Sequence, residues 1–443
     1  MKKQLLFLVS LFFIASMLTA QSWQFDKVFL DLEAPQSNGT GFHGVAVDPD
    51  GNIWMAVYGD LREEILIDGT DTTWTRPLLV MDPNGNHLPF SPLYFLEYTN
   101  GSVDTLADNP RGLNTDKDGN ILYTAYNTIY RIDYKTGKGL NKFSPQNGAS
   151  LTNATQSAAD GNIYAGYVVP GGKPIFMLDN DFTLLGNATD SVFYINRSVV
   201  VSENGQDLYT GSTWSGFGVS HFNSSAPGLI NFEPTDTLGN WYDYYDETLD
   251  STYDVMLWAS TVAIGPNGLL WAGNLRPDWS GPMGGAWYAY DVTTGDLVET
   301  VGIALGDSTA GGSRSPRGIA WTADGQTMYT ADFDYSTINV YQNTSTDVAQ
   351  TGSELPSSYE LGQNYPNPFN PSTMINFSIP ESGLVTLKVF NVLGQEIAEL
   401  VNDVKSAGNY EVSFDASQLT TGMYIYKIQS GNYSATKKML LVK

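Results

Sequence analysis

The sequence contains no cysteine and only three histidines among its 443 residues. Without cysteine there are no disulfides, no thiolate metal sites and no cysteine nucleophiles, so stability must come from a large hydrophobic core. A three-histidine zinc site would need His43, His87 and His221 together, and no pair of them has helical spacing. The composition therefore excludes thiol chemistry and argues against a catalytic zinc.

Positive charge is also scarce in this chain. There are 22 Lys and Arg residues against 47 Asp and Glu, which gives a formal net charge of -25 at pH 7. A surface this acidic repels polyphosphate and anionic lipid, so we expect no nucleic-acid partner. The same acidity favours loose association with divalent cations.

Long apolar runs are limited to the N-terminus. Lys2 and Lys3 precede the apolar run 5–18, and Ala20 offers a small residue at a cleavage point. This is the pattern of a secretory signal peptide, which we predict to span residues 1–20. No later stretch approaches the ~20 apolar residues that a membrane-spanning helix needs.

One pattern of apolar strand, tight turn and second strand recurs six times. Asp-Gly or Asn-Gly at most of the joints supplies the positive φ angles of a tight hairpin. The turn glycines, spaced 42 to 68 residues apart, are Gly51, Gly119, Gly161, Gly205, Gly268 and Gly325. Because a propeller blade takes ~40 to 50 residues, we expect a six-bladed β-propeller over residues 21–345, with insertions in three blades. Segment 23–30 is expected to add an outer strand that joins the last blade to the first.

The amino-acid sequences of two of these repeats resemble a known family. GVAVDPDGNIW from Gly44 and GIAWTADGQTMYTADFDYSTINVY from Gly318 resemble the NHL and gluconolactonase-like six-bladed propellers. The resemblance implies the architecture and leaves the chemistry open, since that superfamily includes lactonases, lyases, ligand binders and interaction platforms.

The last quarter of the chain has a different pattern. Residues 346–362 are rich in Ser, Thr and Gln and are interpreted as a linker. Short alternating segments separated by turns then predict an immunoglobulin-like β-sandwich over residues 363–443, so the whole chain is expected to be all-β. Here LGQNYPNPFNPSTMINFSIP, VTLKVFNVLGQEIAELV and the closing TKKMLLVK resemble the type A C-terminal sorting domain of type IX secretion.

This second resemblance implies a route and a destination. The signal peptide would direct export across the inner membrane, and the type IX machinery would carry the folded protein to the extracellular space or the outer cell surface. A sortase-like cysteine protease would then remove the domain, leaving the cargo released or anchored to surface lipopolysaccharide. The residues that match the family pattern are Tyr365, Pro366, Asn367, Pro368, Phe369, Asn370, Pro371, Gly394, Gly422, Tyr424, Lys437, Lys438 and Lys443. Each also has a framework interpretation, in which prolines fix the chain's entry, glycines make turns and lysines blunt an edge strand.

One aligned position, at the start of each first strand of the repeats, is polar in all six copies. It carries His43, Arg111, Asn153, Arg197, Ser260 and Arg317. We expect these side chains to ring one mouth of the central channel, where three arginines could bind a carboxylate, sulfate or uronic acid through forked hydrogen bonds. The alternative is that the arginines pair with aspartates or strand-end carbonyls and simply close the channel.

The sequence leaves two other kinds of ligand open, calcium and carbohydrate. Calcium is the one cofactor that the sequence suggests, because Asp48 with Asp50, and Asp116 with Asp118, cluster oxygen ligands; Asp-Gly-Asn is equally the ordinary chemistry of a hairpin turn. A carbohydrate ligand is suggested by the insertion 241–258, where aromatic residues stand beside acidic ones. Those aromatics would equally cover a blade's own apolar face.

The sequence thus predicts a secreted or surface-exposed propeller that acts as a ligand- or partner-binding module. The alternative is a propeller enzyme, a lactonase, lyase or glycan-active protein working at the central channel, with His43 as its candidate base. No G-x-S-x-G nucleophile elbow occurs in the sequence. Whether the protein is an enzyme stays open at this stage.

Overall fold

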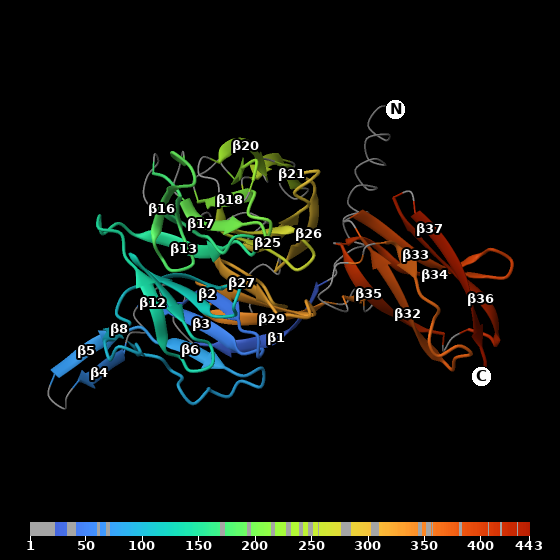
Figure 1. Cartoon of the computed structure of the whole chain (residues 1–443), viewed down its shortest axis with the longest axis horizontal. Helices are drawn as coiled ribbons and strands as arrows, with labels where there is room; N and C mark the ends of the chain where they lie inside the picture. Colours follow the sequence, from blue (N-terminus) through green and yellow to red (C-terminus); the bar gives the residue numbers. More distant parts are fainter. Residues whose placement is uncertain are drawn as a thin grey trace. The chain divides into compact units, whose positions relative to one another are not determined.

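A computed structural model describes most of the chain as two compact units, residues 1–343 and 344–443. The described residues are 23–32, 41–59, 63–67, 71–168, 173–192, 196–213, 218–226, 232–238, 242–246, 251–255, 257–275, 285–302, 310–343, 348–350, 356, 358–380, 383–405, 407–416, 419–431 and 433–443. Within them the secondary structure is strand and turn with no α-helix, which confirms the all-β prediction (Figure 1). The described part also holds no helix long and apolar enough to cross a membrane. The predicted signal peptide lies outside the described residues.

Among its described residues, the first unit contains six antiparallel sheets of three or four strands, and each of them includes one of the six predicted hairpins. The first two sheets are formed by β2 (Gly41–Val47), β3 (Ile53–Tyr58) and β6 (Leu78–Met81), and by β9 (Pro110–Thr115), β10 (Ile121–Ala125), β11 (Thr128–Ile132) and β12 (Gly139–Phe143). The next two are β13 (Leu151–Gln156), β14 (Ile163–Tyr167), β15 (Phe176–Leu178) and β16 (Leu184–Asn187), then β17 (Asn196–Val201), β18 (Asp207–Ser212), β19 (Val219–Asn223) and β20 (Glu233–Leu238). The last two are β23 (Ala259–Ile264), β24 (Leu270–Asn274), β25 (Ala286–Tyr290) and β26 (Leu297–Val301), then β27 (Pro316–Trp321), β28 (Thr327–Asp332), β29 (Thr337–Asn343) and β1 (Trp23–Asp31).

The turn chemistry explains why the hairpins form where the sequence predicts them. Gly51 has φ 84° and Gly325 has φ 67°, a region that glycine enters without steric penalty. In the first hairpin the Asp48 carboxylate accepts hydrogen bonds from the backbone amides of Asp50 and Asn52. Such Asx turns set the register of the two strands through local contacts.

Additional strand pairs occupy the two longest spacings between turn glycines. They are β4 (Glu63–Ile67) with β5 (Asp71–Thr75), β7 (Phe95–Glu97) with β8 (Val103–Thr105), and β21 (Tyr242–Asp246) with β22 (Ser251–Val255). The sequence predicts insertions at these places. The side chains of β21 and β22, which belong to the aromatic insertion 241–258, lie outside the described residues.

The first strands of the six sheets lie next to one another in chain order, and β27 contacts β2 to close the series. Side chains tie neighbouring members together: Thr115 Oγ1 donates to the Val47 carbonyl, and Asn114 Nδ2 donates to the Ala154 carbonyl. Between β27 and β2 the backbones approach closely, because a Cβ on Gly318 would lie 2.7 Å from the Val45 backbone nitrogen. The sixth strand therefore meets the first through bare backbone.

The outer strand of the last sheet comes from the opposite end of the chain. As predicted for segment 23–30, β1 pairs antiparallel with β29, from Trp23 opposite Asn343 to Asp31 opposite Thr337. Between the sheets, Trp54, Trp271 and Trp287 are fully buried. These large side chains fill the space between sheets and bury much apolar area. This burial stabilises a chain that has no disulfides.

The second unit has two four-stranded sheets that share one hydrophobic core, with Phe369, Phe377, Tyr426 and Leu441 among its buried members. One sheet has the order β30 (Val348–Gln350), β35 (Gly408–Asp415), β32 (Ser372–Ile379) and β31 (Glu360–Leu361). The other has the order β34 (Glu396–Lys405), β33 (Gly383–Asn391), β36 (Gly422–Ser430) and β37 (Tyr433–Leu441).

The predicted linker 346–362 differs from what the structure shows. It contains β30 and β31, which pair with β35 and β32 respectively. These strands have three and two residues, too short for their alternation to be recognised in the sequence.

Candidate functional site

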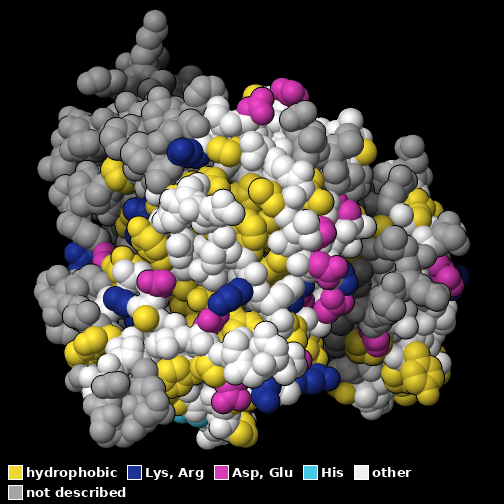
Figure 2. Space-filling view, turned by 60° about the vertical axis from the view of Figure 1, so that its left-hand side comes forward, with side chains coloured by type: hydrophobic (Ala, Val, Ile, Leu, Met, Phe, Trp, Pro, Cys, Tyr) yellow, Lys and Arg dark blue, Asp and Glu magenta, His cyan; other side chains and the backbone are white. Residues whose placement is uncertain are grey.

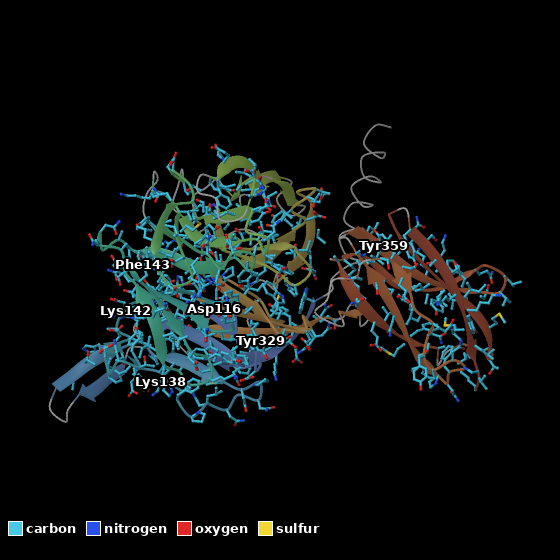
Figure 3. All side chains as sticks on the ribbon, viewed as in Figure 1. Asp116, Lys138, Lys142, Phe143, Tyr329 and Tyr359 are labelled. Carbon is cyan, nitrogen blue, oxygen red and sulfur yellow. The ribbon has the colours of Figure 1, made fainter. Side chains whose placement is uncertain are left out.

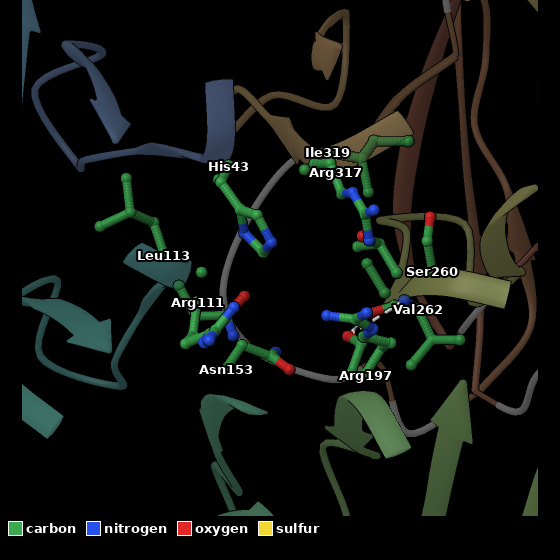
Figure 4. A pocket seen from close by; sticks show the side chains of 16 residues that line it. His43, Arg111, Leu113, Asn153, Arg197, Ser260, Val262, Arg317 and Ile319 are labelled. Carbon is green, nitrogen blue, oxygen red and sulfur yellow. Dashed lines mark hydrogen bonds between the residues drawn. The ribbon is translucent and has the colours of Figure 1, made fainter. Parts of the chain in front are cut away.

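The six polar ring positions lie together around one cavity (Figure 4). His43 lies on β2, Arg111 on β9, Asn153 on β13, Arg197 on β17, Ser260 on β23 and Arg317 on β27. Because each stands at an equivalent place in the first strand of its sheet, all six residues line the same cavity. The predicted juxtaposition is therefore present in the structure.

Two of the six ring residues use their polar atoms to hold the strands together. Asn153 donates from Nδ2 to the Val199 carbonyl at 2.9 Å, and its Oδ1 accepts from the Val199 amide at 2.9 Å. Ser260 Oγ contacts the carbonyl oxygens of Pro316 at 2.6 Å and Gly273 at 3.0 Å. These two residues tie β13 to β17 and β23 to β27, which leaves His43 and the three arginines to face the cavity.

The arginines are held by aromatic and neutral contacts rather than by carboxylates. Arg111 donates from Nε to Ser150 Oγ at 2.8 Å, and its guanidinium lies 5.5 Å from the centre of the Tyr126 ring. The Arg317 guanidinium lies 5.7 Å from the centre of the Phe333 ring. Cation–π contacts position a guanidinium without neutralising it.

Several buried nitrogens at the cavity have no hydrogen-bond partner among the residues that the structure describes. They are Nε of Arg197, Nε and Nη1 of Arg317, and Nδ1 of His43. None of the three ring arginines forms an ion pair with a described Asp or Glu. Since a buried donor without a partner costs about 1–3 kcal/mol, these nitrogens are poised to bind a group that enters the cavity.

The ring is a concentration of positive charge in an acidic protein. Among the described residues that line the cavity there is no Asp or Glu. Burial, followed by repulsion from Arg197, lowers the pKa of Arg317 to about 10, so this side chain stays charged at neutral pH. Burial and then Arg111 likewise lower the pKa of Arg197. By contrast, on the face seen in Figure 2, basic side chains lie among acidic and uncharged ones rather than forming one broad basic patch.

Unlike the three arginines of the ring, His43 is uncharged at neutral pH. Burial is the largest cause that lowers its pKa well below the ordinary 6.5, and the charges of Arg317, Arg111 and Arg197 add to it. The imidazole stacks on Tyr58 at 5.5 Å between ring centres and meets Phe333 edge-on at 6.2 Å. At neutral pH it is therefore an uncharged imidazole held between two aromatic rings.

Tyr58, Tyr126 and Phe333 were not predicted from the sequence, although a signal for them exists. Tyr58 ends β3, and Tyr126 and Phe333 come directly after β10 and β28, in each case seven or eight residues after the turn glycine. An aromatic residue at that aligned position in three of the six repeats marks the packing partners of His43, Arg111 and Arg317.

The calcium candidates are engaged by protein groups. Beyond its two turn amides, the Asp48 carboxylate accepts from Trp54 Nε1 at 2.9 Å. Asp116, which is labelled in Figure 3, accepts from the amides of Asp118 and Asn120. It also forms a buried ion pair with Arg131 at 2.9 Å. Asp50 and Asp118 are the exposed turn residues beside them. Within the described ranges, no group of three His, Asp or Glu side chains could hold a metal, so the geometry lends calcium no support.

In the second unit, the predicted sorting segment 365–371 pairs with Met374 of β32 at Tyr365 and contacts the edge strand β37 at Asn367 and Phe369. The Asn367 Oδ1 accepts from the Leu440 amide at 2.9 Å, and the Phe369 amide donates to the Leu440 carbonyl at 3.0 Å. Phe369 is buried in the core, whereas Tyr365 is 80% exposed. The carbonyl of Pro371 accepts from the Ala416 amide. Pro366 accepts at its carbonyl from Asn364 and Thr373, while Pro368 and Asn370 belong to the intervening turns.

The other predicted sorting residues divide between framework and surface. Gly394, with φ 80°, makes the turn between β33 and β34, and Gly422 begins β36. Tyr424 is buried and donates from its hydroxyl to the Thr420 carbonyl at 2.8 Å. Lys437 is half-buried and Lys438 is exposed on β37, and the exposed Lys443 ends the chain. Both interpretations of these lysines therefore stay open.

Comparison with known proteins identifies the second unit. Residues 363–443 match the family described as the secretion system C-terminal sorting domain. This confirms the predicted sorting domain and indicates export by type IX secretion and a secreted or cell-surface location. No curated protein matches the chain.

Two solved structures are similar to parts of the chain. The extracellular domain of a hybrid two-component system from B. thetaiotaomicron is 11% identical, with a TM-score of 0.42, over 95% of this chain and 57% of that one. The chain thus spans little more than half of that domain's length. The Cps50 (Swd1) β-propeller domain of Myceliophteria thermophila is 11% identical, with a TM-score of 0.41, over 68% of this chain and 83% of that one. At these TM-scores the likeness carries no functional argument.

Proposed function

We propose that the first unit is a closed six-bladed propeller of the NHL and gluconolactonase-like kind that binds an anionic group at one mouth of its channel. The observation that carries this proposal is the set of three arginines around one cavity with no described carboxylate among its lining residues. Guanidinium groups are well suited to carboxylate, sulfate and phosphate oxygens because several N–H donors lie in one plane. The protein then acts outside the cell as a ligand- or partner-binding module.

The second unit would deliver this module as an immunoglobulin-like sandwich. In this proposal the signal peptide directs inner-membrane export, the type IX machinery moves the folded chain outward, and a sortase-like protease removes residues 363–443. The product is released or attached to surface lipopolysaccharide. Most of the matching pattern is exposed and would be available to that machinery: Tyr365, Pro366, Asn367, Pro368, Asn370, Pro371, Gly394, Lys438 and Lys443.

The binding proposal is tested by thermal unfolding of residues 21–443 at constant ionic strength. The ligand panel contains sulfate, phosphate, acetate, citrate, galacturonate and calcium. We expect at least one anion to raise the melting temperature, since a ligand at 100 times its Kd stabilises the native state by about 2.7 kcal/mol. The rise is expected to disappear in Arg111→Gln, when that variant is compared with its own ligand-free baseline.

Arg314→Gln is the matched control for this experiment. Arg314 lies near the ring, 3.9 Å from the Asp334 carboxylate, but it does not line the cavity. Its variant should keep the anion-induced rise, so that loss of one charge is separated from loss of a ring contact. A panel without any anion effect, or a rise that persists in Arg111→Gln, would contradict an anion site at the ring.

An enzyme working at the same cavity is the second candidate. The observation in its favour is the unpartnered Nδ1 of a neutral imidazole, which can accept a proton at pH 7. Turnover of a lactone or an acidic saccharide that vanishes in His43→Gln, with the folded state intact, would favour this candidate. A binding module shows no turnover.

A further inference from the structure

The size of the cavity restricts what the ring can hold. Its volume is about 20 Å³. One water molecule needs ~10–15 Å³ of such free space. The cavity therefore suits one compact group and not a whole sugar ring. A larger ligand would have to place one small anionic group between the arginines.

The charge of the ring residues, and the directions from which they approach the cavity, restrict the kind of anionic group further. Arg111, Arg197 and Arg317 approach from three different strands, and His43 approaches from a fourth (Figure 4). A planar carboxylate offers two oxygens and one negative charge. A tetrahedral oxyanion offers four oxygens in four directions and, as a dianion, offsets more of the positive charge.

The groups that face His43 determine its response to such an anion. They are Tyr58 from β3, Arg111 from β9, Arg197 from β17 and Arg317 from β27. The carboxylates of Asp334 and Asp332 interact electrostatically with Arg317. Asp332 is already satisfied by the Ser313 hydroxyl and the Arg314 and Ser315 amides. The positive charges therefore dominate around the imidazole while the cavity is empty of anions.

On the basis of the binding function above, we infer that the ring selects a doubly charged tetrahedral oxyanion, either sulfate or a phosphate group, and that His43 takes up one proton as the anion binds. The anion offsets two of the three guanidinium charges, and the protonated Nδ1 donates a hydrogen bond to one of its oxygens. Proton and anion then bind with positive coupling, which must be reciprocal.

The sign of this coupling is fixed by the two states of His43. Without the anion, burial and the arginines hold its pKa well below 6.5, so the imidazole is neutral at pH 7. With the anion bound, its pKa rises because a negative charge lies beside it. The affinity for the anion therefore increases as the pH falls below the pKa of His43 in the complex, by at most about tenfold per pH unit for one proton. Sulfate is the clean probe, since its own charge does not change in this range.

The experiment is isothermal titration of residues 21–443 at constant ionic strength, between pH 5.5 and 7.5. Sulfate, inorganic phosphate, methyl phosphate and acetate are titrated in two buffers that differ in ionisation enthalpy, which reports the number of protons taken up. We expect sulfate to bind at least tenfold more tightly than acetate, with uptake of up to one proton at pH 7. Tighter binding of methyl phosphate than of inorganic phosphate would show that the site takes an esterified group of a larger ligand, and the reverse order a free ion.

His43→Gln separates the two parts of the inference. This variant should bind sulfate without proton uptake and with a flat pH profile, while His87→Gln, at an exposed histidine, should behave as the unchanged protein. Sulfate binding without proton uptake in the unchanged protein would overturn the role of His43. Acetate binding as tight as sulfate, still lost in Arg111→Gln, would overturn the selection of a tetrahedral dianion and leave the proposed function standing. If no anion binds, the proposed function itself fails.

Discussion

At the scale of single residues, equivalent positions in the six repeats have taken on two different tasks. Asn153 and Ser260 bond to backbone of a neighbouring sheet, so their polar atoms stabilise the arrangement of strands. His43 and the three arginines keep nitrogens directed at the cavity. The difference follows from reach: a short amide or hydroxyl finds the adjacent strand, whereas a guanidinium extends past it.

His43 should make stability depend on pH. The unfolded chain has an ordinary histidine pKa of about 6.5, and the folded value is lower because of burial and the arginines. Above pH 6.5 His43 is neutral in both states and contributes no pH dependence. As the pH falls below 6.5, the unfolded state binds a proton that the folded state does not, so stability is lost by at most about 1.4 kcal/mol per pH unit.

Denaturant unfolding between pH 5.5 and 7.5 measures this loss. His43→Gln should be less sensitive to acid than the unchanged protein, because it removes one proton-binding group from the unfolded state. His87→Gln, at an exposed histidine, should retain the full acid sensitivity. Equal slopes for His43→Gln and the unchanged protein would show that His43 is not held neutral by its surroundings.

At the scale of elements, the six hairpins could be predicted because their information is local. An Asp-Gly or Asn-Gly turn and two short apolar runs lie within about fifteen residues, and the ring residues follow from counting back from the turn. The tasks of Asn153 and Ser260 could not be predicted, since their partners lie 46 and 56 residues away. The strands β30 and β31 were missed because they are short and paired by tertiary contact alone.

The tie between β13 and β17 should contribute measurably to the stability of the first unit. Asn153→Ala leaves the amide and the carbonyl of Val199 without the two bonds that they now make. We expect a loss of roughly 2–4 kcal/mol in the free energy of unfolding, because each buried group without a partner costs about 1–3 kcal/mol.

Calorimetry of the two variants checks this expectation. Asn147→Ala, at an exposed turn where the side chain accepts one bond from the Ala149 amide, is the control and should cost under about 1 kcal/mol. Similar values for the two variants would mean that the strand tie contributes little beyond an ordinary turn.

At the scale of the whole molecule, a net charge of -25 makes the arginine ring exceptional. We expect the general acidity to repel nucleic acid and anionic surfaces, whereas in our proposal the local charge at the cavity binds one compact anion. The division into two units separates these tasks from delivery: the sorting domain matched at residues 363–443 directs export, and the first unit carries the candidate site.

The most direct test of the anion site is the position of a heavy isostere of sulfate. Crystals of residues 21–443 grown with selenate are measured at the selenium absorption edge, where anomalous scattering locates the anion without reference to any functional assay. We predict a selenium peak inside the cavity, within hydrogen-bond reach of Arg197, Arg317 and His43 nitrogens that are now unpartnered. Selenate bound only at other places on the molecule, with the ring empty, would contradict the account.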